Sequence, residues 1–315
     1  MATASSTTVQ DLGNLQDLSK KEKTFFVNGL KDRKLFPALL EPDKHDWLSS
    51  HSETKQSHNS WWQRLQTAIP PSRKDKKKIG LVPLGGEWTQ SEVEIDKNGK
   101  KESFLSLLQH FAAVFFTGFQ VDVLPPVSIG KLKCKTRMNG GTLQLYIPDV
   151  YKYLQAKWPP GAFCVVGITM IDLYPKESWN FVFGQANSSI GVGVFSFARY
   201  NPLFYEDDPE KRVSLCTSTL VLWRSCKVMV HEICHLFCLQ HCVYFSCCMN
   251  GSNHLEESNN RPMFMCPVCL HKLKSWLGFD VKQRYQAMLD FCTSIKDEHF
   301  EGSCRWLEKA IEELS

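Results

Sequence analysis

The segment His231-Glu232-Ile233-Cys234-His235 constrains this 315-residue chain more than any other feature of its sequence. Residues four apart in a helix lie on one face, so both imidazoles can reach the same metal ion. His241 can join them only if the helix ends soon after His235 and the chain turns back sharply. The sequence therefore predicts a helix, a tight reversal and a three-histidine metal site within residues 231–241.

Zinc is the metal that this arrangement favours. Zinc accepts nitrogen ligands, and a catalytic zinc site leaves one position for water beside three protein ligands. Glu232 would lie beside the metal without ligating it, where it can accept a proton from the attacking water and pass it to the leaving amine. We expect peptide hydrolysis without a covalent intermediate. A chance H-E-x-x-H is the alternative, at about one chain in a hundred, and the third histidine reduces that figure sharply.

Cysteines cluster directly after the histidines. The chain has 13 cysteines, and in a reducing compartment such a number points to metal ligation or buried thiols rather than disulfides. Cys242 and Cys247 form one group and Cys266 and Cys269 another, which together suit a closed, tetrahedral structural zinc site. Buried apolar thiols, or a redox pair of Cys266 and Cys269, are the alternatives. Cys248 could also replace Cys247 as the ligand.

Short apolar runs separated by Gly, Pro and Asn predict β-strands from residue 79 onward. The runs are 79–84, 119–124, 143–147, 163–173, 181–183 and 192–197, and we expect them to form one sheet. Apolar periodicity predicts helices at 103–116, 149–157, 280–292 and 304–314, and a longer helix from Thr217 or Ser218 to about Phe237. Strands alternating with helices favour an α/β arrangement, taken broadly to include α+β.

The chain before residue 79 is more polar and shows only brief apolar clusters. Pro70 and Pro71 precede a basic run there. We interpret residues 1–78 as a loosely packed, partly flexible extension, and residues 79–315 as one catalytic domain that carries the structural zinc site.

Composition excludes several classes of function. The net charge is only +4, and no basic stripe interleaved with aromatic residues is visible, which argues against nucleic-acid binding. The first residues do not read as a secretory signal, and the longest apolar run, 162–173, is shorter than the ~20 residues that a membrane helix needs. We expect a soluble intracellular protein, cytoplasmic or nuclear, that binds no membrane. Nothing in the sequence indicates a protein partner.

Together these residues resemble the archaemetzincins, a metzincin family whose pattern joins the three-histidine motif to an adjacent cysteine, a C-x-M element and a later C-x-x-C. The C-x-M element here is Cys247-Cys248-Met249. Segments 163–175, 178–186 and 191–200 are similar to vertebrate-type members, and the resemblance covers roughly 79–285. It implies a metzincin-like zincin domain with a twisted mixed sheet, an active-site helix, a Met-turn at Met249 and a C-terminal zinc-bearing subdomain.

The resemblance also implies an activity. Family members are similar to aminopeptidases, so we expect a peptidase that acts on short peptides from their amino ends. It would hold two zinc ions per chain, one catalytic and one structural on Cys242, Cys247, Cys266 and Cys269. By analogy the strand near 181–186 would pair with an extended substrate. A catalytically impaired module with two structural metals and a thiol redox protein are the competing functions.

The sequence departs from the family pattern at Cys238, where glycine is usual. Glycine serves there because the chain must adopt a left-handed conformation, which costs a residue with a Cβ about 1 to 2 kcal/mol. Two hypotheses follow: Cys238 displaces His241 slightly, or its thiolate competes with water for the zinc. A second departure, Cys234, lies inside the predicted helix and is easily accommodated.

Overall fold

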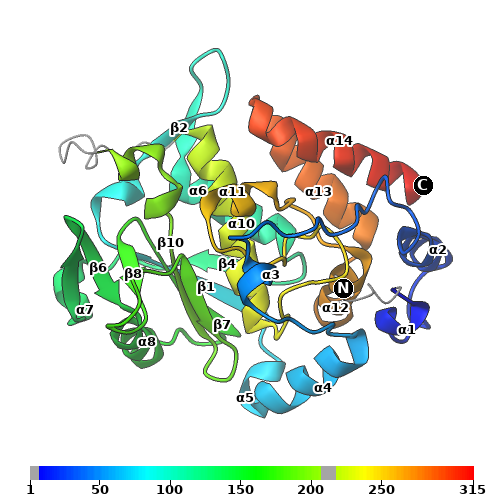
Figure 1. The fold of residues 1–315 in the computed structure, drawn as a ribbon, viewed down its shortest axis with the longest axis horizontal. Helices are drawn as coiled ribbons and strands as arrows, with labels where there is room; N and C mark the ends of the chain where they lie inside the picture. Colours follow the sequence, from blue (N-terminus) through cyan, green and yellow to red (C-terminus); the bar gives the residue numbers. More distant parts are fainter. Residues whose placement is uncertain (1–6, 207–217) are drawn as a thin grey trace.

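The most continuously apolar runs of the chain form the centre of a five-stranded sheet. The computed structural model describes residues 7–206 and 218–315, and Figure 1 shows their arrangement. The strands are ordered β4 (Gln120–Val123), β1 (Lys78–Leu84), β7 (Cys164–Thr169), β10 (Val192–Ser196) and β9 (Gly184–Asn187). Neighbouring strands are parallel except β9, which is antiparallel to β10. The sheet is therefore mixed, and β9 is one of its two edges.

Both faces of this sheet are buried, which explains why its central strands are apolar throughout. Ile79 and Leu81 of β1 point into a large hydrophobic cluster, whereas Val82 and Leu84 belong to a smaller one. Helices α6 (Phe104–Phe115) and α10 (Thr219–Leu236) pack against the sheet with the first cluster, and α8 (Ile147–Ala156) packs with the second. Helices α13 (Val281–Ser294) and α14 (Glu298–Glu313) lie outside α6 and α10. The α/β class predicted from the sequence is confirmed.

The prediction of a single sheet is wrong. Strands β2 (Glu92–Glu94) and β3 (Lys101–Ser103) form a separate antiparallel pair, and β5 (Thr136–Asn139), β6 (Thr142–Tyr146) and β8 (Asp172–Tyr174) form a third sheet. The apolar run 163–173 contains both β7 and β8, because the chain turns after Thr169, whose hydroxyl accepts a hydrogen bond from the Ile171 amide. Both halves of the run are buried, so its composition does not reveal the break.

Helix boundaries follow the predictions in most places. The Ser218 hydroxyl caps α10, and the alternative start at Thr217 lies outside the described residues. The expected strand at 181–183 forms instead at Gly184–Asn187. Helix α14 begins at Glu298, before the predicted start, and α12 (Pro267–Leu277) occupies a stretch for which no helix was predicted. Helix α12 matters for function because Cys266 caps it and Cys269 lies in its first turn.

The described part of the N-terminal extension is packed, not loose. It forms α1 (Val9–Leu12), α2 (Lys20–Gly29), α3 (Trp47–Ser50), α4 (His58–Ala68) and α5 (Pro71–Lys74). Leu12, Phe25, Phe26 and Trp61 are buried in the same cluster as the sheet and α10. In Figure 1 the segment around α3 crosses in front of α10. A domain boundary at residue 78 stays a prediction.

Short elements complete the fold. They are α7 (Ile129–Leu132), α11 (Leu255–Asn260) and the 3-10 helices η1 (Glu87–Gln90), η2 (Ala198–Tyr200) and η3 (Pro202–Tyr205). In the part of the chain that the structure describes, no helix is both long enough and apolar enough to cross a membrane.

Candidate metal centres

Helix α10 carries His231 and His235 one turn apart and ends directly after them. Its end is a Schellman motif, in which the Leu239 amide donates to the Cys234 carbonyl and the Cys238 amide to the His235 carbonyl. Cys238 occupies the left-handed position of this motif, with φ of 63°. The predicted reversal and the predicted left-handed backbone at Cys238 are thus both present.

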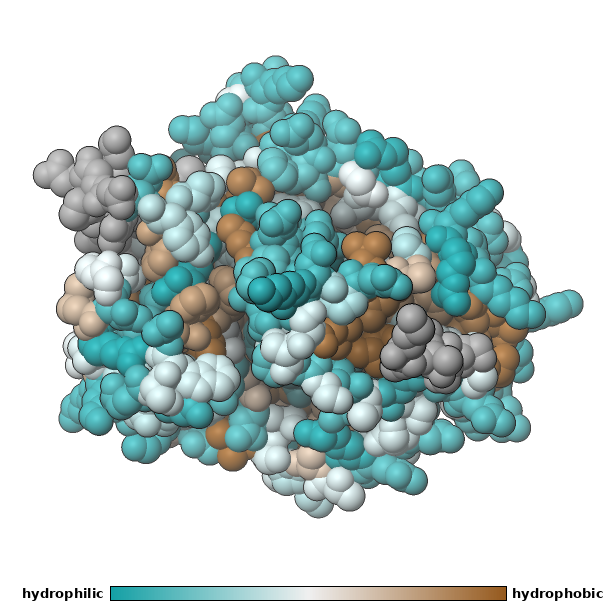
Figure 2. Space-filling model, in the orientation of Figure 1, coloured by the Kyte–Doolittle hydropathy of each residue, from teal (hydrophilic) through white to brown (hydrophobic). Residues whose placement is uncertain are grey.

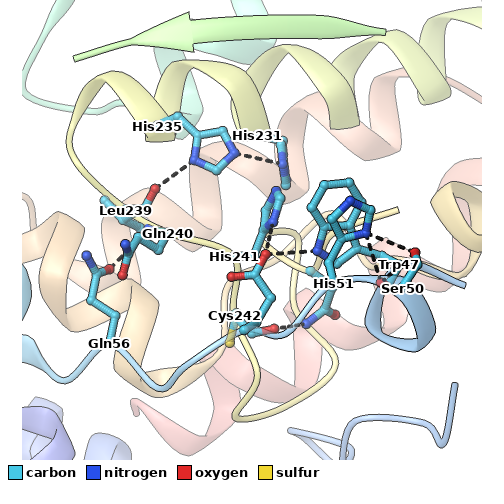
Figure 3. A network of polar contacts seen from close by, with 12 residues as sticks. Trp47, Ser50, His51, Gln56, His231, His235, Leu239, Gln240, His241 and Cys242 are labelled. Carbon is cyan, nitrogen blue, oxygen red and sulfur yellow. Dashed lines mark hydrogen bonds and ion pairs between the residues drawn. The ribbon is translucent and has the colours of Figure 1, made fainter. Parts of the chain in front are cut away.

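The reversal brings His241 back to the helix, and the three imidazoles face one another (Figure 3). Their ring centroids are 4.7, 5.1 and 5.4 Å apart. The Nε2 atoms of His231 and His235 lie 3.1 Å apart. Nitrogen ligands of a tetrahedral zinc are about 3.3 Å apart, given Zn–N distances of about 2.0 to 2.1 Å. The three side chains, with ligand atoms within 4.8 Å of one another, therefore fit a single zinc ion.

Each imidazole has an acceptor for its outer nitrogen, Nδ1. For His231 it is the Cys248 carbonyl at 2.8 Å, and for His235 the Leu239 carbonyl at 2.7 Å. For His241 it is Oε1 of Glu53, also at 2.7 Å. An Nδ1–H donated outward leaves the lone pair of Nε2 free for a metal.

Burial keeps these imidazoles neutral, which ligation requires. Burial lowers the pKa of His231 well below its usual value, and the nearby Arg261 guanidinium adds to this effect. Burial likewise lowers the pKa of His235 to about 3 and lowers that of His241, although Glu53 opposes the shift at His241. The lowered pKa values therefore favour the neutral imidazole, with one ring proton, in all three side chains.

The histidines line a cleft of about 480 Å³. Glu232 lines the same cleft, opposite Gly184 of β9. Burial raises the pKa of Glu232 to about 7, and Arg261 acts in the opposite direction. A carboxylate with such a pKa can both take up and release a proton near neutral pH. Trp47, Trp179, Phe181, Phe183 and Tyr200 provide aromatic walls.

Strand β9 presents to this cleft backbone groups that pair with no other strand of the described residues. The carbonyls of Phe183 and Asn187 accept hydrogen bonds from the β10 side, from the amides of Ser196 and Gly191. Backbone groups alternate along a strand, so those of Gly184 and Ala186 point away from β10 toward the open edge. Both residues line the cleft, so an extended peptide can add to this edge.

Four cysteines form a second, fully buried cluster about the loop that follows His241. The sulfur atoms of Cys242, Cys247, Cys266 and Cys269 lie within 4.8 Å of one another, and those of Cys242 and Cys266 are 3.6 Å apart. Sulfur ligands of a tetrahedral zinc are about 3.8 Å apart, given a Zn–S distance of about 2.3 Å. All four are free thiols in the structure, and they fit a closed zinc site.

Backbone amides donate hydrogen bonds to three sulfur atoms of this cluster. The Tyr244 amide donates to the sulfur of Cys242, the Cys266 amide to that of Cys247, and the Cys269 amide to that of Cys266. Burial alone would raise the pKa of Cys242, but hydrogen bonds from the other three thiols hold it well below its usual value. Burial raises the pKa of Cys247 and Cys266 well above that value, and the hydrogen bond with Cys242 does the same for Cys269, so without a metal the cluster favours a single thiolate, at Cys242. Cys248 is not among the four. Its carbonyl accepts the hydrogen bond of His231 instead.

The loop between the two centres is fixed by Asn250. Its side-chain amide donates to the carbonyls of Cys242 and Phe245, and its side-chain oxygen accepts from the Cys247 amide. Met249, the residue expected in the Met-turn, is buried, and its carbonyl accepts the Cys242 amide at 2.8 Å. The residues that would hold the two metals are thus joined by one hydrogen-bonded loop.

Sequence reasoning missed Glu53, Trp47, Arg261 and Asn250. Arg261 is buried beside the histidines, with one guanidinium nitrogen 3.1 Å from Nδ1 of His231 and 3.0 Å from the Asn250 carbonyl. In the sequence, only its position before Pro262 and shortly before Cys266 could have indicated that Arg261 lies near the metal centres. Glu53 and Trp47 precede the motif by more than 170 residues, and nothing in their local sequence distinguishes them.

Residues 161–275 match the family model of peptidase family M54. Archaemetzincin-2 of Rattus norvegicus is 40% identical over 276 residues, which cover 81% of this chain and 74% of that protein. Archaemetzincin-2 of Homo sapiens is 38% identical over 275 residues, with the same 81% and 74% coverage. The crystal structure of archaemetzincin from Archaeoglobus fulgidus is 25% identical with a TM-score of 0.43, covering 62% of this chain and 99% of that chain. The identity to the archaemetzincin-2 proteins shows that this chain belongs to the archaemetzincin family of zinc metallopeptidases, peptidase family M54.

Proposed function

We propose that this chain hydrolyses short peptides from their amino ends. His231, His235 and His241 hold the catalytic zinc in this proposal, and Glu232 transfers protons. The observation that carries it is the shared cleft, which is lined by the three imidazoles, the Glu232 carboxylate and residues of the edge strand β9. Catalytic metal, general base and peptide-binding edge then meet in one place.

The chain's own residues divide the work of hydrolysis. Zinc bound by the three imidazoles would polarise the scissile carbonyl and lower the pKa of water to roughly 7. Glu232 takes a proton from the attacking water and donates it to the leaving amine. The free backbone groups of Gly184 and Ala186 hold the substrate backbone extended beside these groups. The aromatic walls exclude water and receive a substrate side chain.

A second hollow beside the histidines supports action at a peptide terminus. It is lined by Glu53, Arg64, Ser188 and Cys238 and shares Ala186 with the main cleft. A substrate that follows β9 past Ala186 meets charged side chains of both signs there. Such a hollow suits a charged chain end better than a further run of apolar residues.

The amino-end preference is tested with matched peptides. We expect cleavage of a short peptide with a free amino group, and at least tenfold lower kcat/KM for the same peptide with an acetylated amino end. Equal kcat/KM for the free and the acetylated peptide, or faster cleavage of an internal bond in the acetylated peptide, would contradict the amino-end preference. The chain would then act as an endopeptidase.

Substitution of Glu232 tests hydrolysis itself. Glu232→Gln keeps the size of the side chain but removes its basicity, so we expect kcat to fall about 10²- to 10⁴-fold while zinc content and melting temperature stay unchanged. The alternative function, an impaired module with two structural metals, predicts no measurable turnover in the unsubstituted chain and no change in Glu232→Gln.

We also propose that the cysteine cluster holds a second, structural zinc. Its burial and its amide-capped sulfurs support a site without an open position for water. Elemental analysis of the purified protein should give about two zinc ions per chain. A value of one, together with a reversible disulfide between Cys266 and Cys269, would favour the thiol redox function instead.

A further inference from the structure

Residues 47–61 of the N-terminal extension, here named the brace, run alongside the turn that carries His241. Figure 3 shows Trp47, His51 and Gln56 approaching the histidines and the turn after α10 from this segment. The catalytic motif itself contains no residue of the brace.

The brace supplies the acceptor for His241. The other two ligands donate Nδ1–H to carbonyls close to the motif, at Leu239 and Cys248, whereas His241 donates to the carboxylate of Glu53. Glu53 is itself fixed, because the same oxygen accepts the indole N–H of Trp47 at 2.8 Å. The Trp47 ring also contacts the His241 ring edge to face, with centroids 4.8 Å apart.

The brace also holds the turn that precedes His241. The Gln56 side chain donates to the Cys238 carbonyl at 3.0 Å and accepts the Gln240 amide at 3.1 Å. The Trp61 indole donates to the Phe237 carbonyl at 2.8 Å. Contacts at Phe237, Cys238 and Gln240 therefore hold a turn in which Cys238, not glycine, occupies the left-handed position.

The start of the brace is anchored to residues 251–257. The Trp47 amide donates to Glu257, and its ring lies so close to Gly251 that a Cβ there would come within 2.4 Å. Asp46 accepts a hydrogen bond from His254. Asp46, His254 and Glu257 lie within metal-binding distance of one another, but each bonds to protein groups, and they serve as this anchor.

We propose that Glu53 is a positioning residue for His241, and that the brace thereby completes the catalytic metal centre. This inference rests on the proposed function only in taking His241 as a zinc ligand. A carboxylate that accepts Nδ1–H fixes the tautomer and orientation of the ring and makes Nε2 a stronger ligand. Loss of such a partner typically weakens metal affinity or activity 10- to 100-fold.

The test measures metal affinity, not turnover. Cobalt(II) replaces zinc, and its absorption differs between nitrogen and thiolate ligands. Titration with a competing chelator therefore measures the cobalt affinity of the histidine centre separately from that of the cysteine centre. We expect Glu53→Ala to weaken cobalt binding at the histidine centre about 10- to 100-fold. Glu53→Gln keeps an oxygen acceptor but loses the charge, so its affinity should lie between those of Glu53→Ala and the unsubstituted chain.

Glu41→Gln is the matched control, because Glu41 is an exposed carboxylate of the same extension outside the brace. Its affinity and cobalt spectrum should equal those of the unsubstituted chain. Melting temperatures of the variants with metal at the cysteine centre alone separate positioning from folding: a purely structural Glu53 would lower them without a selective change at the histidine centre.

Equal cobalt affinity in Glu53→Ala, Glu53→Gln and Glu41→Gln would overturn the proposal. If Glu53→Ala fails to fold, the cobalt affinity of Glu53→Gln is compared with that of Glu41→Gln. Weaker cobalt binding at the histidine centre of Glu53→Gln supports the role of Glu53, and equal binding contradicts it. The proposed peptidase function is tested by turnover in Glu232→Gln, so either idea can fail while the other stands.

Discussion

The histidine cluster and the cysteine cluster lie within one stretch of chain, residues 231–269, yet they differ in nearly every physical respect. The cysteines are buried, and amides cap three of their sulfur atoms. His235 and His241 are partly exposed and border a cleft. Figure 2 shows that hydrophilic side chains cover most of this face of the molecule, with hydrophobic residues visible in its hollows. A closed centre suits structure and an open one suits chemistry.

The two centres also depend on each other unequally. Cys242 follows His241 directly, and its amide bonds the carbonyl of Met249, so the cysteine cluster fixes the loop that delivers the third histidine. The histidines, in contrast, contact this loop through the hydrogen bond from His231 to the carbonyl of Cys248, which is not one of the four clustered cysteines. We therefore expect damage to the cysteine centre to disable the histidine centre, and damage to the histidine centre to leave the cysteine centre intact.

The largest expected effect is that of Cys269→Ala. Binding of a structural zinc can contribute about 10 to 16 kcal/mol in small zinc-folded peptides, so loss of one ligand should cost this chain on the order of several kcal/mol. The melting temperature should fall by about 10 °C or more, zinc content by at least one ion per chain, and peptidase activity with it. Calorimetry and elemental analysis measure the first two.

Cys248→Ala is the control for that prediction. Cys248 is adjacent to Cys247 and equally buried but lies outside the cluster, so its replacement should lower the melting temperature by only a few degrees and leave the zinc content unchanged. A loss of zinc in Cys248→Ala as large as in Cys269→Ala would mean that the ligand set has been misassigned.

A smaller effect, confined to the open centre, is expected for Gly184→Ala. A Cβ at Gly184 would lie 2.7 Å from Cβ of Phe195 and 3.0 Å from the carboxyl carbon of Glu232. Either β9 or Glu232 must move, and a displacement of about 1 Å in a catalytic group can cost about 100-fold in rate. We expect kcat/KM to fall about that much while zinc content stays constant.

The matched control is Gly193→Ala on the neighbouring strand. A Cβ there would meet its nearest atoms at 3.5 Å and 3.6 Å, ordinary contact distances, and none of them belongs to Glu232. Activity should be nearly unchanged. Similar losses in both variants would show that the sheet, not the position of Glu232, determines the rate.

The sequence predicted the local parts of both centres well. The spacing of His231 and His235 required a helix, and His241 required its abrupt end and a sharp reversal of the chain. The left-handed backbone at Cys238 was expected from the family resemblance, because glycine is usual at that position. The cysteine pairs likewise indicated a cluster, because four thiols in two neighbouring groups have few other arrangements near one loop.

What could not be predicted depends on contacts between distant parts of the chain. The apolar run 163–173 gives no sign that β7 and β8 join different sheets, since both are buried. Likewise the polar texture of the extension concealed that Trp61 is buried and that Glu53 reaches His241. Hydrophobic periodicity identifies the faces of elements but not their partners.

The smallest expected effect is that of replacing Cys238. It tests whether the thiol of this residue affects the histidine centre. This residue is absent from the group of ligand atoms around the histidines, and burial raises its pKa, which disfavours a thiolate. Cys238→Gly removes the left-handed strain of about 1 to 2 kcal/mol but adds the backbone entropy of glycine, about 0.5 to 1 kcal/mol. We expect a net stabilisation of up to about 1.5 kcal/mol, measured by denaturant unfolding, and activity within about threefold of the unsubstituted chain.

Cys238→Ala separates strain from sulfur chemistry, because alanine keeps the Cβ and the strain but removes the thiol. If only glycine raises activity, strain displaces His241 despite the brace. If both substitutions raise activity to the same extent, the thiol competes for the metal, and the low thiolate content expected from its burial is wrong. Unchanged activity in both, with stabilisation only in Cys238→Gly, is the result we expect, because Gln56 and Trp61 already hold the turn in place.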